Sequence, residues 1–171
     1  MIRRLGHPSH VQVDALSARS SRQPDRYVPV VNVDVSWRGR FGNQEINELH
    51  AAAFRTRLFS DDEWNWRQLV EDHSLGWVVA RIDGRLVGFA NVIWDGLVHA
   101  WIQDVMVADR VGRQGIGTAL VGAAADGART AGCETLHVDF DAGLSPFYID
   151  ACGFTPTSAG LLDLTSPSQQ S

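Results

Sequence analysis

The chain has 171 residues and a formal net charge of −5. This length predicts one domain with a core large enough to fold without disulfides or metals. Charged residues make up 20% of the chain and hydrophobic residues 44%, a balance typical of a globular protein. The acidic charge argues against a nucleic-acid partner, because nucleic-acid-binding proteins usually carry a basic patch.

All 15 basic residues of the chain are arginines, and the sequence contains no lysine. This absence excludes enzymes that form a Schiff base on lysine, such as pyridoxal-phosphate enzymes and lysine-dependent aldolases. It also excludes ordinary Walker-type nucleotide hydrolases, which need a phosphate-loop lysine.

The N-terminal stretch differs in charge from the rest of the chain. Residues 1–28 carry five arginines against Asp14 and Asp25, a net charge of +3, whereas the remaining 143 residues carry −8. We interpret this stretch as a flexible extension, with a partner-binding arm as the alternative. It lacks the apolar run of a signal peptide, and no stretch approaches the 18 apolar residues of a membrane span. We therefore expect one domain over residues 29–165, a tail over residues 166–171 and no membrane partner.

Two cysteines, Cys133 and Cys152, predict neither a metal centre nor a disulfide framework. Both lie in apolar sequence surroundings and are expected to be buried thiols. Free thiols indicate a reducing compartment, so the expected location is the cytoplasm.

The first half of the chain begins with alternating apolar and polar residues over 30–37, which predict a strand. Asn43 is expected to cap a helix, and Ser60 to open a capping box for a second helix ending near Glu71. The first helix has an apolar face that consists of Ile46, Leu49, Ala53 and Phe54.

Three apolar runs follow, over residues 76–82, 86–94 and 97–107. An Asp-Gly pair separates each run from the next, and Asp-Gly between apolar runs is a strong hairpin signal. The runs therefore predict a three-stranded antiparallel meander.

A helix rich in small residues is predicted over residues 115–131, with Gly132 at its C-terminal end. Alternation over residues 135–141 predicts another strand, and Ser145 and Pro146 open a short helix over residues 147–152. Residues 161–164 are read as a last edge strand. A strand–helix–strand step demands a parallel crossover, so we predict a mixed α/β (α+β) sheet with helices on both faces.

The loop before the long helix carries the clearest chemical signal. A strand ends, a glycine-containing loop follows over residues 112–117, and the helix begins. Free N–H groups and the positive end of the helix dipole then meet at one place, which suits phosphate groups. Arg113 adds positive charge nearby. Glycines at a helix start are common, however, so this motif is weak by itself.

The second segment is Phe147-Tyr148, followed by Gly153-Phe154. A tyrosine next to phenylalanine on a short helix is most often a core residue. The alternative is that the Tyr148 phenol, whose ordinary pKa is near 10, donates a proton to a leaving group.

Together these segments resemble the GNAT acetyltransferase superfamily over roughly residues 31–164. The run from Arg113 to Leu120 is similar to the family's pyrophosphate-binding loop, and Phe147-Tyr148 with Gly153-Phe154 to its aromatic-tyrosine element. Each motif is weak alone, whereas their order and spacing together are specific. The family loop usually starts with Gln or Arg where this chain has Gly112, and it often has Asn where this chain has Asp141.

The resemblance implies that acetyl-CoA is the acetyl donor, held where two central strands splay apart, and that no metal takes part. It implies that Tyr148 protonates the departing CoA thiolate. The cofactor contacts that it implies fall in two runs, Val105, Met106, Val107 and Gly112, Arg113, Gln114, Gly115, Ile116, Gly117, Thr118.

The general base is the open question, because an amine must lose a proton before it attacks. Asp104 is the first candidate, since it directly precedes Val105 on an otherwise apolar strand. It would accept a proton or bind a cationic substrate, and a structural role is the alternative. Weaker candidates are Glu45, His50, His99, His137 and Asp139.

We therefore expect an acetyl-CoA-dependent N-acetyltransferase that acts on a small, cationic amine. A non-catalytic acyl-CoA-binding module on the same fold is the alternative. A dinucleotide-dependent oxidoreductase is disfavoured, because the full GxGxxG pattern after a first strand is missing. The acceptor is not identified by the sequence, and a homodimer is an alternative to a monomer.

Overall fold

The computed structural model describes residues 10–13 and 32–165. These residues fall into two compact units, one up to Phe140 and one from Asp141, and each is described by itself. Most of the predicted N-terminal extension and the tail over residues 166–171 lie outside the described residues.

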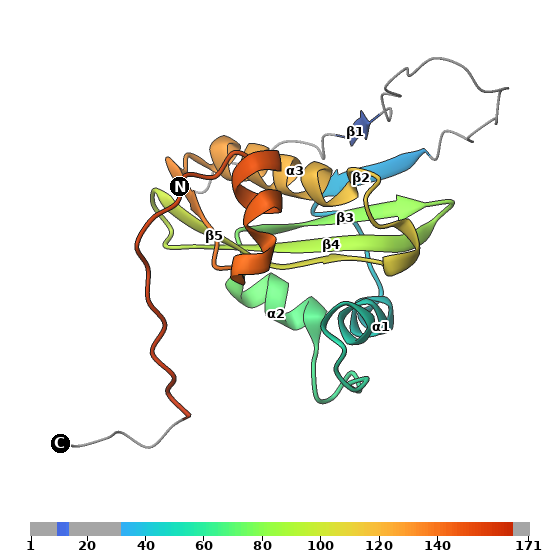
Figure 1. Cartoon of the computed structure of the whole chain (residues 1–171). Helices are drawn as coiled ribbons and strands as arrows, with labels where there is room; N and C mark the ends of the chain where they lie inside the picture. Colours follow the sequence, from blue (N-terminus) through green and yellow to red (C-terminus); the bar gives the residue numbers. More distant parts are fainter. Residues whose placement is uncertain (1–9, 14–31, 166–171) are drawn as a thin grey trace, which may run out of the picture. The chain divides into compact units, whose positions relative to one another are not determined.

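The first unit is built on one six-stranded sheet with strands in chain order (Figure 1). Each neighbouring pair is antiparallel except β5 and β6, which are parallel. The strands are β1 (His10–Val13), β2 (Val33–Trp37), β3 (Gly76–Ile82), β4 (Arg85–Trp94), β5 (His99–Val107) and β6 (Thr135–His137).

Helices cover both faces of this sheet. Helices α1 (Asn43–Phe54) and α2 (Trp66–His73) lie on one face, and α3 (Ile116–Ala131) lies on the other (Figure 1). Gly88 and Phe89, which are adjacent in β4, face the helices on opposite sides of the sheet. A Cβ atom on Gly88 would lie 3.0 Å from a methyl carbon of Leu120 in α3, whereas the Phe89 ring packs against Trp66 of α2. Within the described ranges, no helix is long and apolar enough to cross a membrane.

The predicted meander and crossover are confirmed. Strands β3, β4 and β5 are consecutive antiparallel neighbours, and Gly84 turns the first hairpin with a positive φ of 76°. Helix α3 ends at Gly132, whose φ of 97° is in the left-handed region that favours glycine. The parallel pairing of β5 and β6 confirms the mixed sheet.

The predicted start of the second helix is wrong. Ser60 and Glu63 do form a capping-box-like turn, in which the Ser60 N–H donates to the Glu63 carboxylate at 3.0 Å. Arg57 also binds this carboxylate, and these hydrogen bonds lower the pKa of Glu63 to about 2. Helix α2 begins only at Trp66, because the Asn65 side chain caps the N–H of Gln68.

The predicted cap of the first helix is displaced by one residue. Gly42 is the N-cap, and Asn43 is the first helical residue. The Asn43 side chain instead donates to Asp61 at 2.8 Å and to the Trp64 carbonyl at 3.0 Å. It therefore holds the connection between α1 and α2, which is a tertiary role that the local sequence does not reveal.

Three further expectations are corrected, and strand β1 is a strand that the sequence did not predict. Strand β6 is only three residues long, because its pairing with β5 stops at His137. Residues 161–164 form no strand, and Leu161 is 89% exposed. The thiols expected to be buried, Cys133 and Cys152, are only partly buried.

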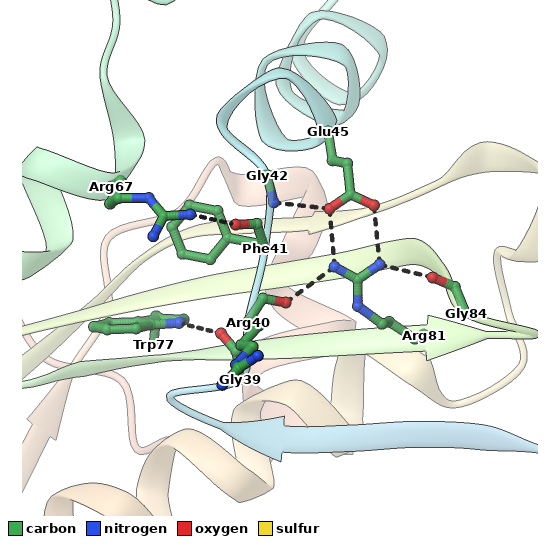
Figure 2. A network of polar contacts seen from close by, with 9 residues as sticks. All are labelled: Gly39, Arg40, Phe41, Gly42, Glu45, Arg67, Trp77, Arg81 and Gly84. Carbon is green, nitrogen blue, oxygen red and sulfur yellow. Dashed lines mark hydrogen bonds and ion pairs between the residues drawn. The ribbon is translucent and has the colours of Figure 1, made fainter.

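An ion pair fixes the start of α1 to the sheet (Figure 2). The Arg81 guanidinium of β3 donates to both carboxylate oxygens of Glu45 at 2.9 Å, and Glu45 also accepts the Gly42 N–H at 2.8 Å. Arg81 further donates to the Arg40 and Gly84 carbonyls. The hydrogen bond from Arg81 is the main cause that lowers the pKa of Glu45.

We expect Glu45→Gln to lower the free energy of unfolding by about 1–2 kcal/mol at neutral pH, because it weakens the ion pair and the cap. The lowered pKa means that this stabilisation is present above the ordinary carboxyl pKa and is lost as the pH falls through the folded-state pKa. Denaturant titration at several pH values measures the effect. Glu48→Gln is the control, since Glu48 is exposed on the same helix and accepts a hydrogen bond from the exposed Gln44 side chain. An equal loss in both variants would contradict the assignment.

Candidate active site

A β-bulge in β5 defines the centre of the candidate site. Phe89 of β4 pairs with Met106, and Asn91 pairs with Gln103, so that Asp104 and Val105 together face Ala90. Asp104 has a positive φ of 52°, a conformation that aspartate tolerates better than most residues. A bulge of this kind changes the direction of the side chains that follow it. Met106 consequently shares a sheet face with Phe89, towards α1 and α2.

The Asp104 carboxyl is half-buried and has two identified neighbours. Asn91 of β4 is 1% exposed and hydrogen-bonds to this carboxyl. His50 of α1 interacts with it electrostatically. Burial is the main cause that raises the pKa of Asp104, and these two neighbours act in the opposite direction. A carboxyl with a raised pKa binds a proton more readily than an exposed aspartate does.

Asn91 and Ser74 are residues that sequence reasoning missed. The Ser74 hydroxyl, at the end of α2, donates to the Asn91 side-chain oxygen at 2.6 Å. This bond leaves the Asn91 amide free to donate, which orients it towards Asp104. The sequence does contain a signal for Asn91, which is the one asparagine in the apolar strand predicted over residues 86–94. A buried amide needs polar partners, so such a residue points to a polar site.

The pairing of β5 with β6 covers only the start of β5. Three register pairs join the strands, the last being Trp101 with His137. Within the described residues of the first unit, no strand pairing with β6 is found beyond Trp101, and Val105, Met106 and Val107 follow that point in β5. The Met106 side chain is fully buried, which means that a ligand beside this part of β5 would meet backbone groups.

The chain then turns into α3 through an exposed loop. Gly115 is the N-cap of α3 with a φ of 79°, and it provides no side-chain cap. The first N–H groups of α3, from Ile116, Gly117 and Thr118, therefore point out of the helix end without a capping side chain. Arg113, also with a positive φ, is exposed beside them.

The second compact unit contains Tyr148. It lies in a π-helical segment (Pro146–Ala151), and Gly153 ends this segment with a φ of 77°. Tyr148 is 6% exposed and packs edge-on against Phe147 and Phe154. Burial raises the pKa of its phenol, so the phenol keeps its proton at neutral pH.

The chain is similar in sequence and in fold to known proteins. The model of the acetyltransferase (GNAT) family matches residues 43–154. The chain belongs to the GNAT acetyltransferase family. No curated protein matches it significantly.

Three solved structures illustrate how far the likeness of this GNAT protein extends. A Trypanosoma brucei acetyltransferase is 23% identical, with a TM-score of 0.65, over 77% of this chain and 99% of that one. Glucosamine-6-phosphate N-acetyltransferase from Arabidopsis thaliana is 18% identical, with a TM-score of 0.62, over 78% and 99%. An aminoglycoside N-acetyltransferase in complex with CoA is 18% identical, with a TM-score of 0.64, over 80% and 97%. At these identities the structures confirm the GNAT fold.

The weaker base candidates of this GNAT protein lie in different places. Glu45 is engaged by Arg81 and holds α1. His99 and His137 pair with each other, with 3.0 Å between Nδ1 and Nε2, and Trp101 stacks on His137 at 4.8 Å. Asp139 is exposed beyond the end of β6. Of these candidates, His50 is the one with an identified interaction with Asp104.

We expect Asp104→Asn to raise the free energy of unfolding of this GNAT protein at pH 7. Because its pKa is raised on folding, the ionised carboxyl carries a penalty that appears as the pH rises through the folded-state pKa. The variant and the wild type should therefore have similar stability near pH 3 and diverge towards pH 7. Asp95→Asn is the control and should lower the free energy of unfolding at pH 7, because backbone N–H groups of Leu97 and His99 lower the pKa of Asp95. A loss of stability at pH 7 in Asp104→Asn would contradict this assignment.

Proposed function

We propose that the protein is an acetyl-CoA-dependent N-acetyltransferase that transfers the acetyl group directly to the amine of a small, cationic molecule. The observation that carries the proposal is the β5 bulge, which turns a half-buried carboxyl towards α1 and α2 where the β6 pairing has ended. A carboxyl at such a position can bind an ammonium group and accept its proton.

The residues around the start of α3 fit a pyrophosphate. An anion at this place would receive backbone N–H donors, the helix dipole and the charge of Arg113. Gly115 has open space where a Cβ atom would lie, so the backbone can be approached closely. Gly112 replaces the usual first side chain of the family loop, and Arg113 would supply the missing positive charge.

The part of β5 beyond Trp101 would hold the rest of the donor. Backbone groups of Val105 and Val107 would bind the acetyl and pantetheine portions of the donor. The buried Met106 side chain would anchor this part of β5 to the core. Acetyl-CoA supplies an activated thioester, so the chain needs neither a covalent nucleophile nor a metal ligand for this transfer.

Two side chains would handle the protons. Asp104 would remove the proton from the acceptor ammonium, which frees the nitrogen lone pair for attack. Tyr148 would protonate the leaving thiolate, a role that rests on the family resemblance and is supported by its buried, protonated phenol. The net charge of −8 over residues 29–171 favours the approach of a cationic acceptor.

The names of two relatives support an amine acceptor. One is an aminoglycoside N-acetyltransferase and the other a glucosamine-6-phosphate N-acetyltransferase. The test is release of free thiol from acetyl-CoA over a panel of aminoglycosides, polyamines, amino acids and peptides. Turnover with a cationic amine is the expected result. Tight acetyl-CoA binding without thiol release from any member would instead favour the non-catalytic acyl-CoA-binding module.

Tyr148→Phe is expected to lower kcat by about 10²-fold, because it removes only the proton donor. The KM for acetyl-CoA should change little. The ring packing against Phe147 and Phe154 remains, so the melting temperature should stay close to that of the wild type. An unchanged kcat would remove Tyr148 from this role.

Gly115→Ala is expected to weaken acetyl-CoA binding at least tenfold. A Cβ atom strains the left-handed conformation and occupies the space next to the proposed pyrophosphate site. Calorimetric titration with acetyl-CoA measures the effect. Gly122→Ala is the matched control, because Gly122 lies inside α3 with open space around it and no positive φ. Equal affinity in the two variants would place the donor elsewhere.

A further inference from the structure

Three aromatic side chains in the last two strands of the sheet form one continuous group that the proposed mechanism does not use. Trp101 and His137 are register partners in the parallel pair, and their rings stack at 4.8 Å with 17° between the ring planes. His99 lies two residues before Trp101, and its Nδ1 atom is 3.0 Å from the Nε2 atom of His137. We call the rings of His99, Trp101 and His137 the aromatic platform.

The aromatic platform lies on the sheet face towards α1 and α2. Gln103 of β5 is opposite Asn91 of β4, and residues opposite each other in an antiparallel pair share a face. Asn91 is two residues beyond Phe89, whose ring packs against Trp66 of α2. Since alternate side chains of a strand share a face, the two β5 members of the platform lie on this face with Gln103.

The residues of β5 on this face are open to solvent, although helices lie over the same side of the sheet. His99 and Gln103 are exposed, and Trp101 is partly exposed. The alternate residues on the opposite face, Ala100 and Ile102, are buried. The row of His99, Trp101 and Gln103 is therefore a surface, whereas the other face of β5 belongs to the core.

This row leads to the bulge. Gln103 directly precedes Asp104, the proposed base, and Trp101 precedes Asp104 by three residues. Three residues of a strand span about 10 Å at 3.3 Å per residue. A substrate that places its amine at Asp104 can thus reach the aromatic platform with a group about 10 Å from the reacting nitrogen.

The surroundings of the row favour an uncharged ring. The row contains no aspartate, glutamate or arginine, and its neighbours in β4 on this face are Ile93, opposite Trp101, and Asn91, opposite Gln103. A second charged group of the substrate would find no counter-ion in the row. Aromatic rings pack favourably against other rings in offset or edge-on arrangements. The chemistry of this surface therefore fits a neutral aromatic group better than a second ammonium group.

We propose that the aromatic platform binds an aromatic ring of the acceptor, so that the substrate is an amine whose ring lies about 10 Å from the reacting nitrogen. The inference rests on the proposed function, since it places the reacting amine at Asp104. The platform contributes binding and orientation only. Asp104 still takes the ammonium proton, and the amine still attacks the thioester of acetyl-CoA.

A series of phenylalkylamines, from benzylamine to phenylhexylamine, tests the spacing in the wild type. We expect kcat/KM to rise about tenfold as the spacer lengthens enough for the ring to reach the platform. It should also exceed the kcat/KM of the n-alkylamine of equal length. Equal values for phenylalkylamines and n-alkylamines would overturn the proposal. Higher values for aminoglycosides or polyamines than for every phenylalkylamine would overturn it too.

Trp101→Leu tests the platform itself. The KM for the best phenylalkylamine should rise about tenfold, while kcat and the KM for acetyl-CoA stay near the wild type. Trp101→Phe should restore most of the affinity, because it keeps a ring at this position. Trp94→Leu is the matched control, since Trp94 is 39% exposed and opposite Ala100, on the other face of the sheet. An equal change of KM in Trp101→Leu and Trp94→Leu would overturn the assignment.

NMR measures binding without turnover. The best phenylalkylamine should shift the imidazole signals of His99 and His137 in the wild type, and the n-alkylamine of equal length should not. Unshifted signals with the phenylalkylamine would overturn the platform. Failure of the proposed function gives a different result, in which the wild type releases no thiol with any amine although the phenylalkylamine still shifts these signals.

Discussion

The one-residue bulge in β5 is the constraint on which the candidate site depends. Two residues, Asp104 and Val105, occupy the space opposite Ala90, so the alternation of side chains shifts by one position. Met106 thereby enters the core beside Phe89, and the carboxyl that precedes it turns towards α1 and α2. Without the bulge, Gln103 and Met106 would lie on opposite faces of the sheet, because side chains alternate along a regular strand. The same short stretch lies beyond the last register pair that joins β5 to β6.

A second constraint fixes what lies opposite this carboxyl. The Glu45–Arg81 pair ties the first turn of α1 to β3, and the rest of the helix follows rigidly from that anchor. His50, five residues beyond Glu45 on the same helix, is thereby held in a buried position. An ion pair at the start of α1 thus helps to position a residue near the candidate site. Besides its contribution to stability, this partly exposed ion pair sets the direction of a helix that carries the buried His50.

The sequence predicted the meander and the crossover because both depend on local signals. Asp-Gly pairs and glycine at the end of α3 have conformational preferences that act over a few residues. Local signals misplaced the start of α2. Ser60 and Glu63 satisfy each other in an isolated turn, and the helix starts later, where the Asn65 side chain caps the Gln68 N–H and Asn43 donates to the neighbouring Trp64 carbonyl. Residues 161–164 also show where local signals fail, because an apolar run forms a strand only if it can pair with the edge of a sheet. Leu161 is instead exposed.

For the site, the sequence by itself determined the residue types: a carboxyl before Val105, glycines at the start of α3, and a tyrosine after the crossover. These follow from order along the chain and from resemblance to a family. The tertiary structure decided which groups meet. The amide of Asn91 acts on Asp104 from a neighbouring strand, and the charge of His50 acts on it from a helix, through packing and register that no short stretch encodes. A side chain's ionisation depends on its neighbours in space, so the raised pKa of Asp104 became visible only in the folded chain.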